Sequence, residues 1–132
     1  METASGGCQC GAIRYEALGP PGDVYVCHCE ECRRQSSSAF GISVIYDEAA
    51  VRILKGETRT WRRPAAEGDM TCHFCGDCGA RLFHFAGGTV SVKGGSLDEP
   101  PDLAGCKHIW VKRKLPGVVI PPGAETFEGD PP

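Results

Sequence analysis

The sequence contains no long hydrophobic run, and its first residues lack the pattern of an export signal. No segment reaches the roughly 20 mainly apolar residues that a membrane-spanning helix needs. Residues 1–7 have no basic stretch followed by an apolar one, which excludes a typical signal peptide. We therefore expect a cytoplasmic protein with no membrane partner.

An excess of positive charge is also missing. The 132 residues include 14 Lys and Arg against 17 Asp and Glu, which gives a formal net charge of −3 at pH 7. Nucleic-acid-binding domains usually carry a clustered basic surface, so we expect no nucleic-acid partner. The length fits a single domain over residues 1–132, and we see no internal repeat or linker in it.

Glycine and proline are abundant, with 18 and 10 residues, and they favour turns and short strands over long helices. Strands are expected at 12–17, 24–26, 40–46, 51–54, 58–62, 71–74, 81–85, 89–93 and 108–111, and one helical turn at 30–36. We expect residues 51–54 to pair with 58–62, and residues 89–93 to pair with 81–85. The pattern predicts one all-β domain.

Seven of the nine cysteines fall into three tight clusters. The clusters are Cys8-x-Cys10, Cys27-x-Cys29-x-x-Cys32 and Cys75-x-x-Cys78. Without an export signal, such spacings are typical of metal ligands rather than disulfides. Two pairs make a four-thiolate site, and the trio makes a three-thiolate site with one open position. Zinc with four protein ligands is usually structural, whereas three ligands leave room for water or substrate.

The two cysteine pairs suit one metal ion. In an extended segment Cys8 and Cys10 share a face, so that both sulfurs can converge. The two residues between Cys75 and Cys78 allow a tight turn, and Gly79 can take the backbone angles that aim N–H groups at a thiolate.

Two cysteines fall outside this scheme. Cys72 offers an alternative C-x-x-C pair with Cys75, but that pair lacks the glycine turn. Cys72 and the isolated Cys106 are interpreted as small core residues. A metal-storage or redox role for these two is a further hypothesis.

The trio has no obvious fourth ligand in its own segment. His28 lies between Cys27 and Cys29, so its side chain should point away from their metal, and we favour an outer-shell or core role over ligation. The alternative is a second structural zinc completed by a distant side chain. The candidates for that ligand are His73, His84, His108, Cys72 and Cys106.

An open three-thiolate zinc site favours sulfur chemistry. Three thiolates leave a formal charge of −1, so the zinc should activate water less than in a neutral three-histidine site. Such a site still binds soft ligands, including a fourth thiolate. We therefore expect a reaction that makes or breaks a bond to the sulfur of a thiol substrate, with Cys27, Cys29 and Cys32 at its centre.

Seven short stretches, spread over most of the chain, occur in the same order as in a known protein family. They are GCQCGAIRY (7–15), CHCEECRR (27–34), SAF (38–40), LKG (54–56), FCGDCG (74–79), GSLD (95–98) and HIWV (108–111). Together they resemble the glutathione-dependent formaldehyde-activating enzyme family, which includes the centromere protein V domain. The chain departs from the family at Ser37, where glycine is frequent, and at Gly117, where tryptophan is frequent.

The resemblance implies a mainly β fold of several small antiparallel sheets stapled by zinc, similar to the suppressor-of-sec-four fold. It implies a structural zinc on Cys8, Cys10, Cys75 and Cys78, and a catalytic zinc on Cys27, Cys29 and Cys32. It also implies a carbon–sulfur lyase that acts on glutathione or related thiol adducts. The founding reaction of the family joins glutathione to formaldehyde and gives S-hydroxymethylglutathione.

Glutathione is anionic, so cationic and hydroxyl side chains that follow the trio are candidate substrate contacts. They are Arg33, Arg34, Ser36, Ser37 and Ser38. A solvated turn is the alternative interpretation of this segment. The second functional hypothesis is a non-enzymatic zinc-binding module for a protein partner, as in the exchange-factor relatives of the fold.

Overall fold

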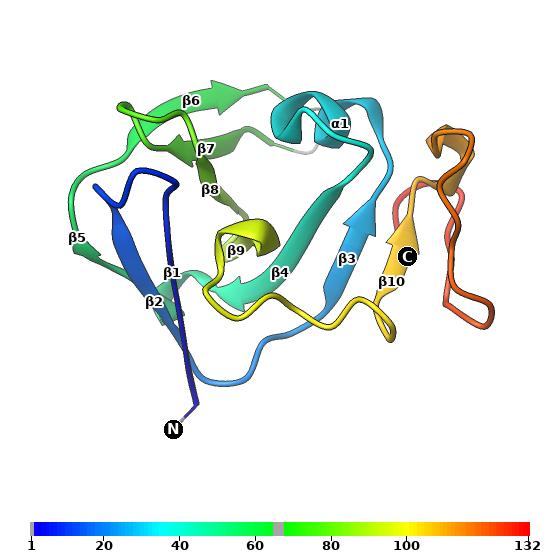
Figure 1. Cartoon of the computed structure of the whole chain (residues 1–132), viewed down its shortest axis with the longest axis horizontal. Helices are drawn as coiled ribbons and strands as arrows, with labels where there is room; N and C mark the ends of the chain where they lie inside the picture. Colours follow the sequence, from blue (N-terminus) through cyan, green and yellow to red (C-terminus); the bar gives the residue numbers. More distant parts are fainter. Residues whose placement is uncertain (1, 65–67) are drawn as a thin grey trace.

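The computed structural model describes residues 2–64 and 68–132 and is built from two β-sheets in that part of the chain (Figure 1). The three-stranded sheet has the order β1 (Thr3–Gly7), β2 (Arg14–Leu18), β5 (Val51–Lys55). The seven-stranded sheet has the order β10 (Lys107–Ile109), β3 (Val24–Cys27), β4 (Gly41–Asp47), β9 (Thr89–Lys93), β8 (Arg81–Ala86), β7 (Met70–Phe74), β6 (Arg59–Arg63). All neighbours pair antiparallel except β10 and β3, which are parallel.

The described helical segments are short. They are α1 (Glu30–Ser36) and the 3₁₀ turns η1 (Glu48–Ala50), η2 (Gly94–Ser96) and η3 (Val111–Arg113). The mainly β prediction is confirmed, and so are the helical turn at 30–36 and the pairing of residues 89–93 with 81–85. None of the described helices is long and apolar enough to cross a membrane.

One predicted pairing is wrong. Residues 51–54 do not pair with 58–62, because β5 joins β2 in the small sheet and β6 joins β7 in the large one. The chain crosses between the sheets at Gly56, which has φ +81 and whose Cβ would lie 2.3 Å from the Ala12 carbonyl oxygen. Two strands on either side of a turn therefore do not form a hairpin here; the turn carries the chain from the small sheet to the large sheet.

Strand β1 and the end of β10 also differ from expectation. The sequence of β1, TASGG, has little β-branched character, and it is a strand because it pairs along its whole length with β2. Strand β10 ends at Ile109 rather than at residue 111, because Trp110 adopts a left-handed backbone (φ 56) and starts η3.

The hydrophobic core lies between the two sheets. The small sheet contributes Tyr15 and Ala17, and the large sheet contributes alternate residues of its central strands, including Val44, Val92 and Phe83. Tyr15 packs edge-on against Phe83 with ring centroids 4.7 Å apart. Because side chains alternate along a strand, the residues between these core positions point to the opposite face of the large sheet.

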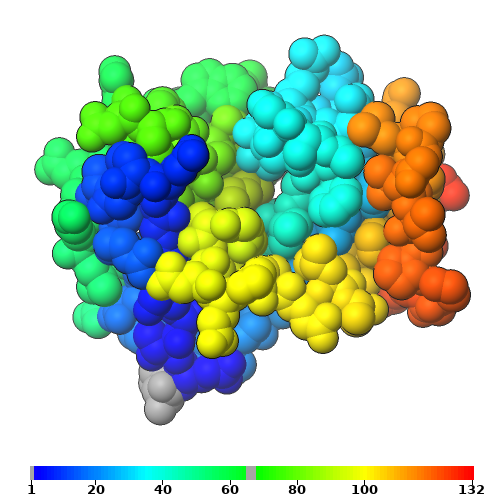
Figure 2. Space-filling model, viewed as in Figure 1, coloured from blue at the N-terminus to red at the C-terminus, as the bar shows by residue number. Residues whose placement is uncertain are grey.

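The C-terminal tail lies beside β10 (orange to red in Figures 1 and 2). The backbone of His108 donates to the Glu125 carbonyl at 2.9 Å and accepts from the Phe127 N–H at 2.9 Å. Trp110 donates from its backbone to Gly129 at 3.1 Å and from its indole Nε1 to Asp130 at 2.7 Å. The tail thus covers the outer edge of the large sheet next to the cysteine trio.

Candidate metal centres and their cavity

The two cysteine pairs meet at one point. The sulfurs of Cys8, Cys10, Cys75 and Cys78 all lie within 4.8 Å of one another, so this cluster could hold a metal ion. Cys8 and Cys10 follow β1, whereas Cys75 and Cys78 lie between β7 and β8. The cluster therefore ties the N-terminal strands of the small sheet to the large sheet.

Backbone N–H groups surround this cluster. Ile13 donates to the Cys8 sulfur at 3.2 Å. In the second turn, Gly79 has the positive φ (+81) that the C-x-x-C-Gly spacing predicts, and its own N–H donates to the Cys75 carbonyl at 2.8 Å. The N–H of Ala80 lowers the pKa of the Cys78 thiol to about 6. Hydrogen bonding thus favours the thiolate of Cys78, the form in which cysteine binds metals.

The trio forms the second cluster. The sulfurs of Cys27, Cys29 and Cys32 lie within 4.8 Å of one another. Cys27 ends β3, and Cys29 is the N-cap of α1, where its sulfur accepts the Cys32 backbone N–H at 3.3 Å. Hydrogen bonds from Cys27 and Cys32 lower the pKa of Cys29. The strand end and the helix start together bring three sulfurs to one side of a possible metal ion.

A glycine on β4 allows this close packing. Gly41 pairs with Cys27 across β3 and β4. A Cβ at position 41 would lie 2.8 Å from Gln35 Nε2 and 3.2 Å from Cys32 Cβ. A side chain at position 41 would displace Gln35 and push Cys32 away slightly, so glycine favours the close packing of α1 on β4.

No fourth donor joins the trio among the described residues. Within 4.8 Å of the three sulfurs, the cluster gains no further His, Cys, Asp or Glu from residues 2–64 and 68–132. None of the predicted alternatives joins the cluster; Cys72, for example, is buried on β7 opposite His84 of β8. His28, between Cys27 and Cys29, is fully buried, and its Nε2 lies 3.0 Å from His108 Nδ1.

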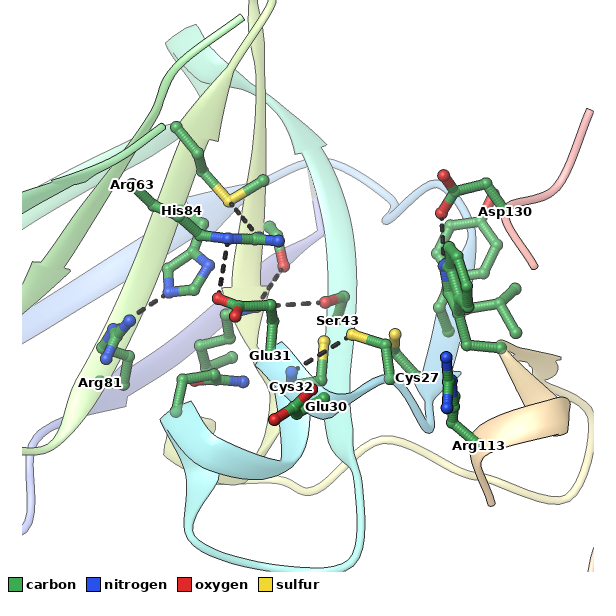
Figure 3. A pocket seen from close by; sticks show the side chains of 18 of the residues that line it. Cys27, Glu30, Glu31, Cys32, Ser43, Arg63, Arg81, His84, Arg113 and Asp130 are labelled. Atoms are coloured by element: carbon green, nitrogen blue, oxygen red, sulfur yellow. Dashed lines mark hydrogen bonds and ion pairs between the residues drawn. The ribbon is translucent and has the colours of Figure 1, made fainter. Parts of the chain in front are cut away.

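The trio opens into a cavity of about 550 Å³ on the face of the large sheet that points away from the core (Figure 3). The sheet residues that line it are Tyr25, Cys27, Ser43, Ile45, Arg63, Met70, Arg81, His84, Ser91, Lys93 and Ile109. Helix α1 adds Glu30 and Glu31, and the C-terminal part adds Trp110, Arg113 and Asp130. The cavity wall is therefore assembled from all seven strands of the large sheet and from segments far apart in the chain.

Cations are prominent in this wall. Arg63 pairs with Glu31 at 3.1 Å, and Arg81 donates from Nε to His84 Nε2 at 3.1 Å. Burial, together with the charges of Lys93 and Arg81, lowers the pKa of His84 to about 2, so this ring is neutral at physiological pH. Arg113, on η3, lies on the far side of the trio in Figure 3.

Lys93 is the most buried of these cations, with only 9% of its surface exposed. Its ammonium donates to Ser43 Oγ at 3.3 Å and to Ser91 Oγ at 3.1 Å. Burial lowers the pKa of Lys93, and the charges of Cys32 and Cys27 act in the opposite direction.

The predicted substrate contacts lie beside this cavity. Neither Arg33 nor Arg34 is among its described lining residues, and Arg34 pairs with Glu30 at 3.1 Å on the exposed side of α1. The three serines, Ser36, Ser37 and Ser38, line a second cavity of about 730 Å³. The two cavities share Gln35, Arg81 and Lys93.

Comparison with known proteins identifies the family of this chain. A model of the family described as glutathione-dependent formaldehyde-activating enzyme matches residues 3–113. The chain belongs to this family. The match covers both cysteine clusters, and membership supports a glutathione-related role in general.

One solved structure is similar in fold to the structure of this protein. It is the crystal structure of a Rhodobacter sphaeroides protein, with a TM-score of 0.56, 20% identity, and coverage of 93% of this chain and 98% of that chain. At this identity the likeness concerns the fold alone. A search of curated proteins gives no match.

Proposed function

We propose that this family member is a zinc-dependent enzyme of the carbon–sulfur lyase type that acts on glutathione or a related thiol adduct. The observation that carries the proposal is the trio of Cys27, Cys29 and Cys32, which has three sulfurs within 4.8 Å and opens into a cation-lined cavity. The reaction that founded the family, formaldehyde plus glutathione to S-hydroxymethylglutathione, is the model reaction.

The donor sets of both clusters fit zinc. Four thiolates make a closed site, so Cys8, Cys10, Cys75 and Cys78 would hold a structural ion. Three thiolates leave one position, so Cys27, Cys29 and Cys32 would hold a catalytic ion. That ion would supply a sulfur-preferring positive centre that keeps a thiol deprotonated at neutral pH.

The residues of the cavity have three tasks in this proposal. The sheet face and α1 limit the access of water to the side of the trio where the thiol sulfur would lie. Arg81, Arg113 and Lys93 attract an anionic substrate. We retain Arg33, Arg34, Ser36, Ser37 and Ser38 as proposed contacts for the outer parts of a larger thiol such as glutathione, because the serine cavity adjoins the trio cavity.

We also infer one domain over residues 1–132 and a cytoplasmic location.

Binding of glutathione to the cobalt-substituted protein tests the proposal. Cobalt makes thiolate ligation visible as a charge-transfer band, and we expect glutathione to increase that band. The apparent affinity should rise with pH while the free thiol still has a proton to lose. S-methylglutathione, which has no such proton, is the matched control and should bind much more weakly. An unchanged spectrum with glutathione, or equal binding of both compounds, would reject glutathione as the ligand.

A non-enzymatic module for a protein partner is the second candidate. The observation that favours it is the exposure of two large apolar side chains on neighbouring segments of the chain, Leu54 on β5 (58% exposed) and Trp61 on β6 (50% exposed). Failure of thiol binding, combined with a partner whose binding is lost in Trp61→Ser, would move this candidate ahead.

A further inference from the structure

The floor of the trio cavity holds a cluster of hydrogen-bond donors. Lys93 and Ser43 are paired residues on β9 and β4, and Ser91 lies two residues before Lys93 on the same face. Cys27 pairs with Gly41, which lies two residues before Ser43 on that face of β4. The donor cluster therefore lies directly beside the trio.

The hydrogen bonds inside this cluster leave donors for a ligand. An ammonium has three N–H groups and no acceptor, and two of those of Lys93 go to serine oxygens. Because Ser43 Oγ and Ser91 Oγ accept from Lys93, the hydroxyl protons of both serines are available to another acceptor. In the described residues, neither hydroxyl donates to a second protein group.

The negative side chains of the cavity already have other partners. Glu31 pairs with Arg63 and Glu30 pairs with Arg34, each at 3.1 Å, and Asp130 accepts from the Trp110 indole. Among residues 2–64 and 68–132, no carboxylate lies within 4.0 Å of the Lys93 ammonium. Lys93 is a buried cation that pairs with no carboxylate and still has one N–H to donate, so this arrangement can hold an anionic group.

We propose that Lys93, Ser43 and Ser91 form a carboxylate subsite, and that the carbonyl compound joined to the thiol bears a carboxylate next to its carbonyl carbon. This inference rests on the proposed function, because it places the thiol sulfur at the open side of the trio. A carboxylate accepts several hydrogen bonds and attracts the Lys93 ammonium by its negative charge. Its position close to the sulfur follows from the place of Lys93 beside the trio.

The reaction is then an addition that balances without a further reactant. The thiol sulfur forms a bond to the aldehyde carbon, and the π bond of the carbonyl breaks. The carbonyl oxygen takes up one proton, which replaces the proton that the thiol gave up. The product is a 2-hydroxy-2-thio acid, and its carboxylate remains on Lys93 while the new C–S bond forms.

Two small thiols test the subsite without any measurement of activity. Mercaptoacetate carries a carboxylate on the carbon that bears sulfur, and mercaptoacetamide is its neutral isostere. Calorimetry with the zinc-loaded protein should give about tenfold to a hundredfold tighter binding of mercaptoacetate, as expected for a hydrogen-bonded charge pair. In Lys93→Met this ratio should fall to near one, and in Lys93→Arg part of it should return.

Lys107→Met is the matched control, because Lys107 pairs with Asp23 at 3.1 Å and is not among the described lining residues. It should leave the ratio unchanged. Zinc content and melting temperature of each variant show whether it is folded and loaded.

Each other outcome overturns the inference in a recognisable way. If Lys93→Met weakens the binding of mercaptoacetate and mercaptoacetamide equally, the role of Lys93 is to balance the negative charge of the cysteine trio. If Lys93→Met weakens the binding of glutathione but leaves the ratio of mercaptoacetate to mercaptoacetamide binding unchanged, Lys93 binds a carboxylate of glutathione itself. If mercaptoacetamide and glutathione do not bind the wild-type protein at all, the proposed function fails as well; if they bind and mercaptoacetate has no advantage, only the subsite fails.

Discussion

The sulfur of Cys10 lies 3.8 Å from the sulfur of Cys75, although 65 residues separate the two along the chain. This contact joins the end of the first strand pair to the turn between β7 and β8. The trio is different, because Cys27, Cys29 and Cys32 lie within six residues and join only the end of β3 to the start of α1. The two clusters should therefore contribute unequally to stability.

Cys75→Ser should destabilise the whole protein, whereas Cys29→Ser should leave the fold largely intact. Loss of one of four ligands weakens a metal site whose binding energy is part of folding, so we expect a fall in melting temperature on the order of 10 °C or more. Cys29→Ser should change the melting temperature by a few degrees at most and should abolish thiol binding. Thermal melts and zinc analysis of the purified variants measure both effects.

Cys72→Ser is the matched control for this pair. Cys72 is fully buried but belongs to neither cluster, so the same substitution there reports only the cost of burying a hydroxyl. It should keep the full zinc content. If Cys29→Ser unfolds the protein as severely as Cys75→Ser, the trio is structural.

Stepwise chelation should release two zinc ions in sequence. The trio offers three protein ligands and opens into the cavity, so its ion should leave first and leave the fold intact. The ion at the four-cysteine cluster should leave later, together with unfolding. Zinc analysis combined with circular dichroism follows both steps, and a single ion, or two that leave together with unfolding, would contradict this division.

Ser37→Gly should stabilise the protein. Ser37 ends α1 in a left-handed backbone (φ 51, ψ 41), a conformation that costs a residue with a Cβ about 1–2 kcal/mol. Glycine accepts this conformation but loses more entropy on folding, so we expect a net gain of about 0.5–1 kcal/mol in the free energy of unfolding. Urea denaturation measures it.

Ser38→Gly provides the control for Ser37→Gly. Ser38 does not have a positive φ, and its hydroxyl donates to the Phe40 carbonyl at 3.0 Å. This variant should lose stability. Equal effects of the two substitutions would mean that backbone strain at Ser37 is not released. The strain also gives a physical reason for the glycine that the family often has at this position.

The sequence predicted the cysteine pairs and the trio well because the spacing within each of them is local information. Spacings such as Cys75-x-x-Cys78-Gly79 already contain the turn that directs the sulfurs. The cavity cations were missed because Arg81, Lys93 and Arg113 come from β8, β9 and η3, and only the strand order brings them together. The alternation in β9 held a usable signal, since Val92 faces the core and Lys93 must face the other way.

Acid should destabilise the protein partly through His84. Its pKa is lowered to about 2 by burial and by Lys93, Arg81 and Arg63, whereas the unfolded chain has a pKa near 6.5. Below about pH 6.5 the unfolded state binds a proton that the folded state does not, so stability is lost as the pH falls. From pH 7.5 to 5.5 this residue should account for a loss of about 1.4 kcal/mol.

His84→Gln isolates that contribution, because glutamine does not titrate and its amide oxygen can still accept from Arg81. Whatever its stability relative to the wild type at pH 7.5, the variant should gain about 1.4 kcal/mol on the wild type at pH 5.5. Urea denaturation at both pH values with saturating zinc measures the difference. Acid also weakens metal binding, but that effect is common to both proteins and cancels in the comparison. A difference between wild type and variant that is the same at pH 7.5 and pH 5.5 would show that His84 does not titrate as its burial requires.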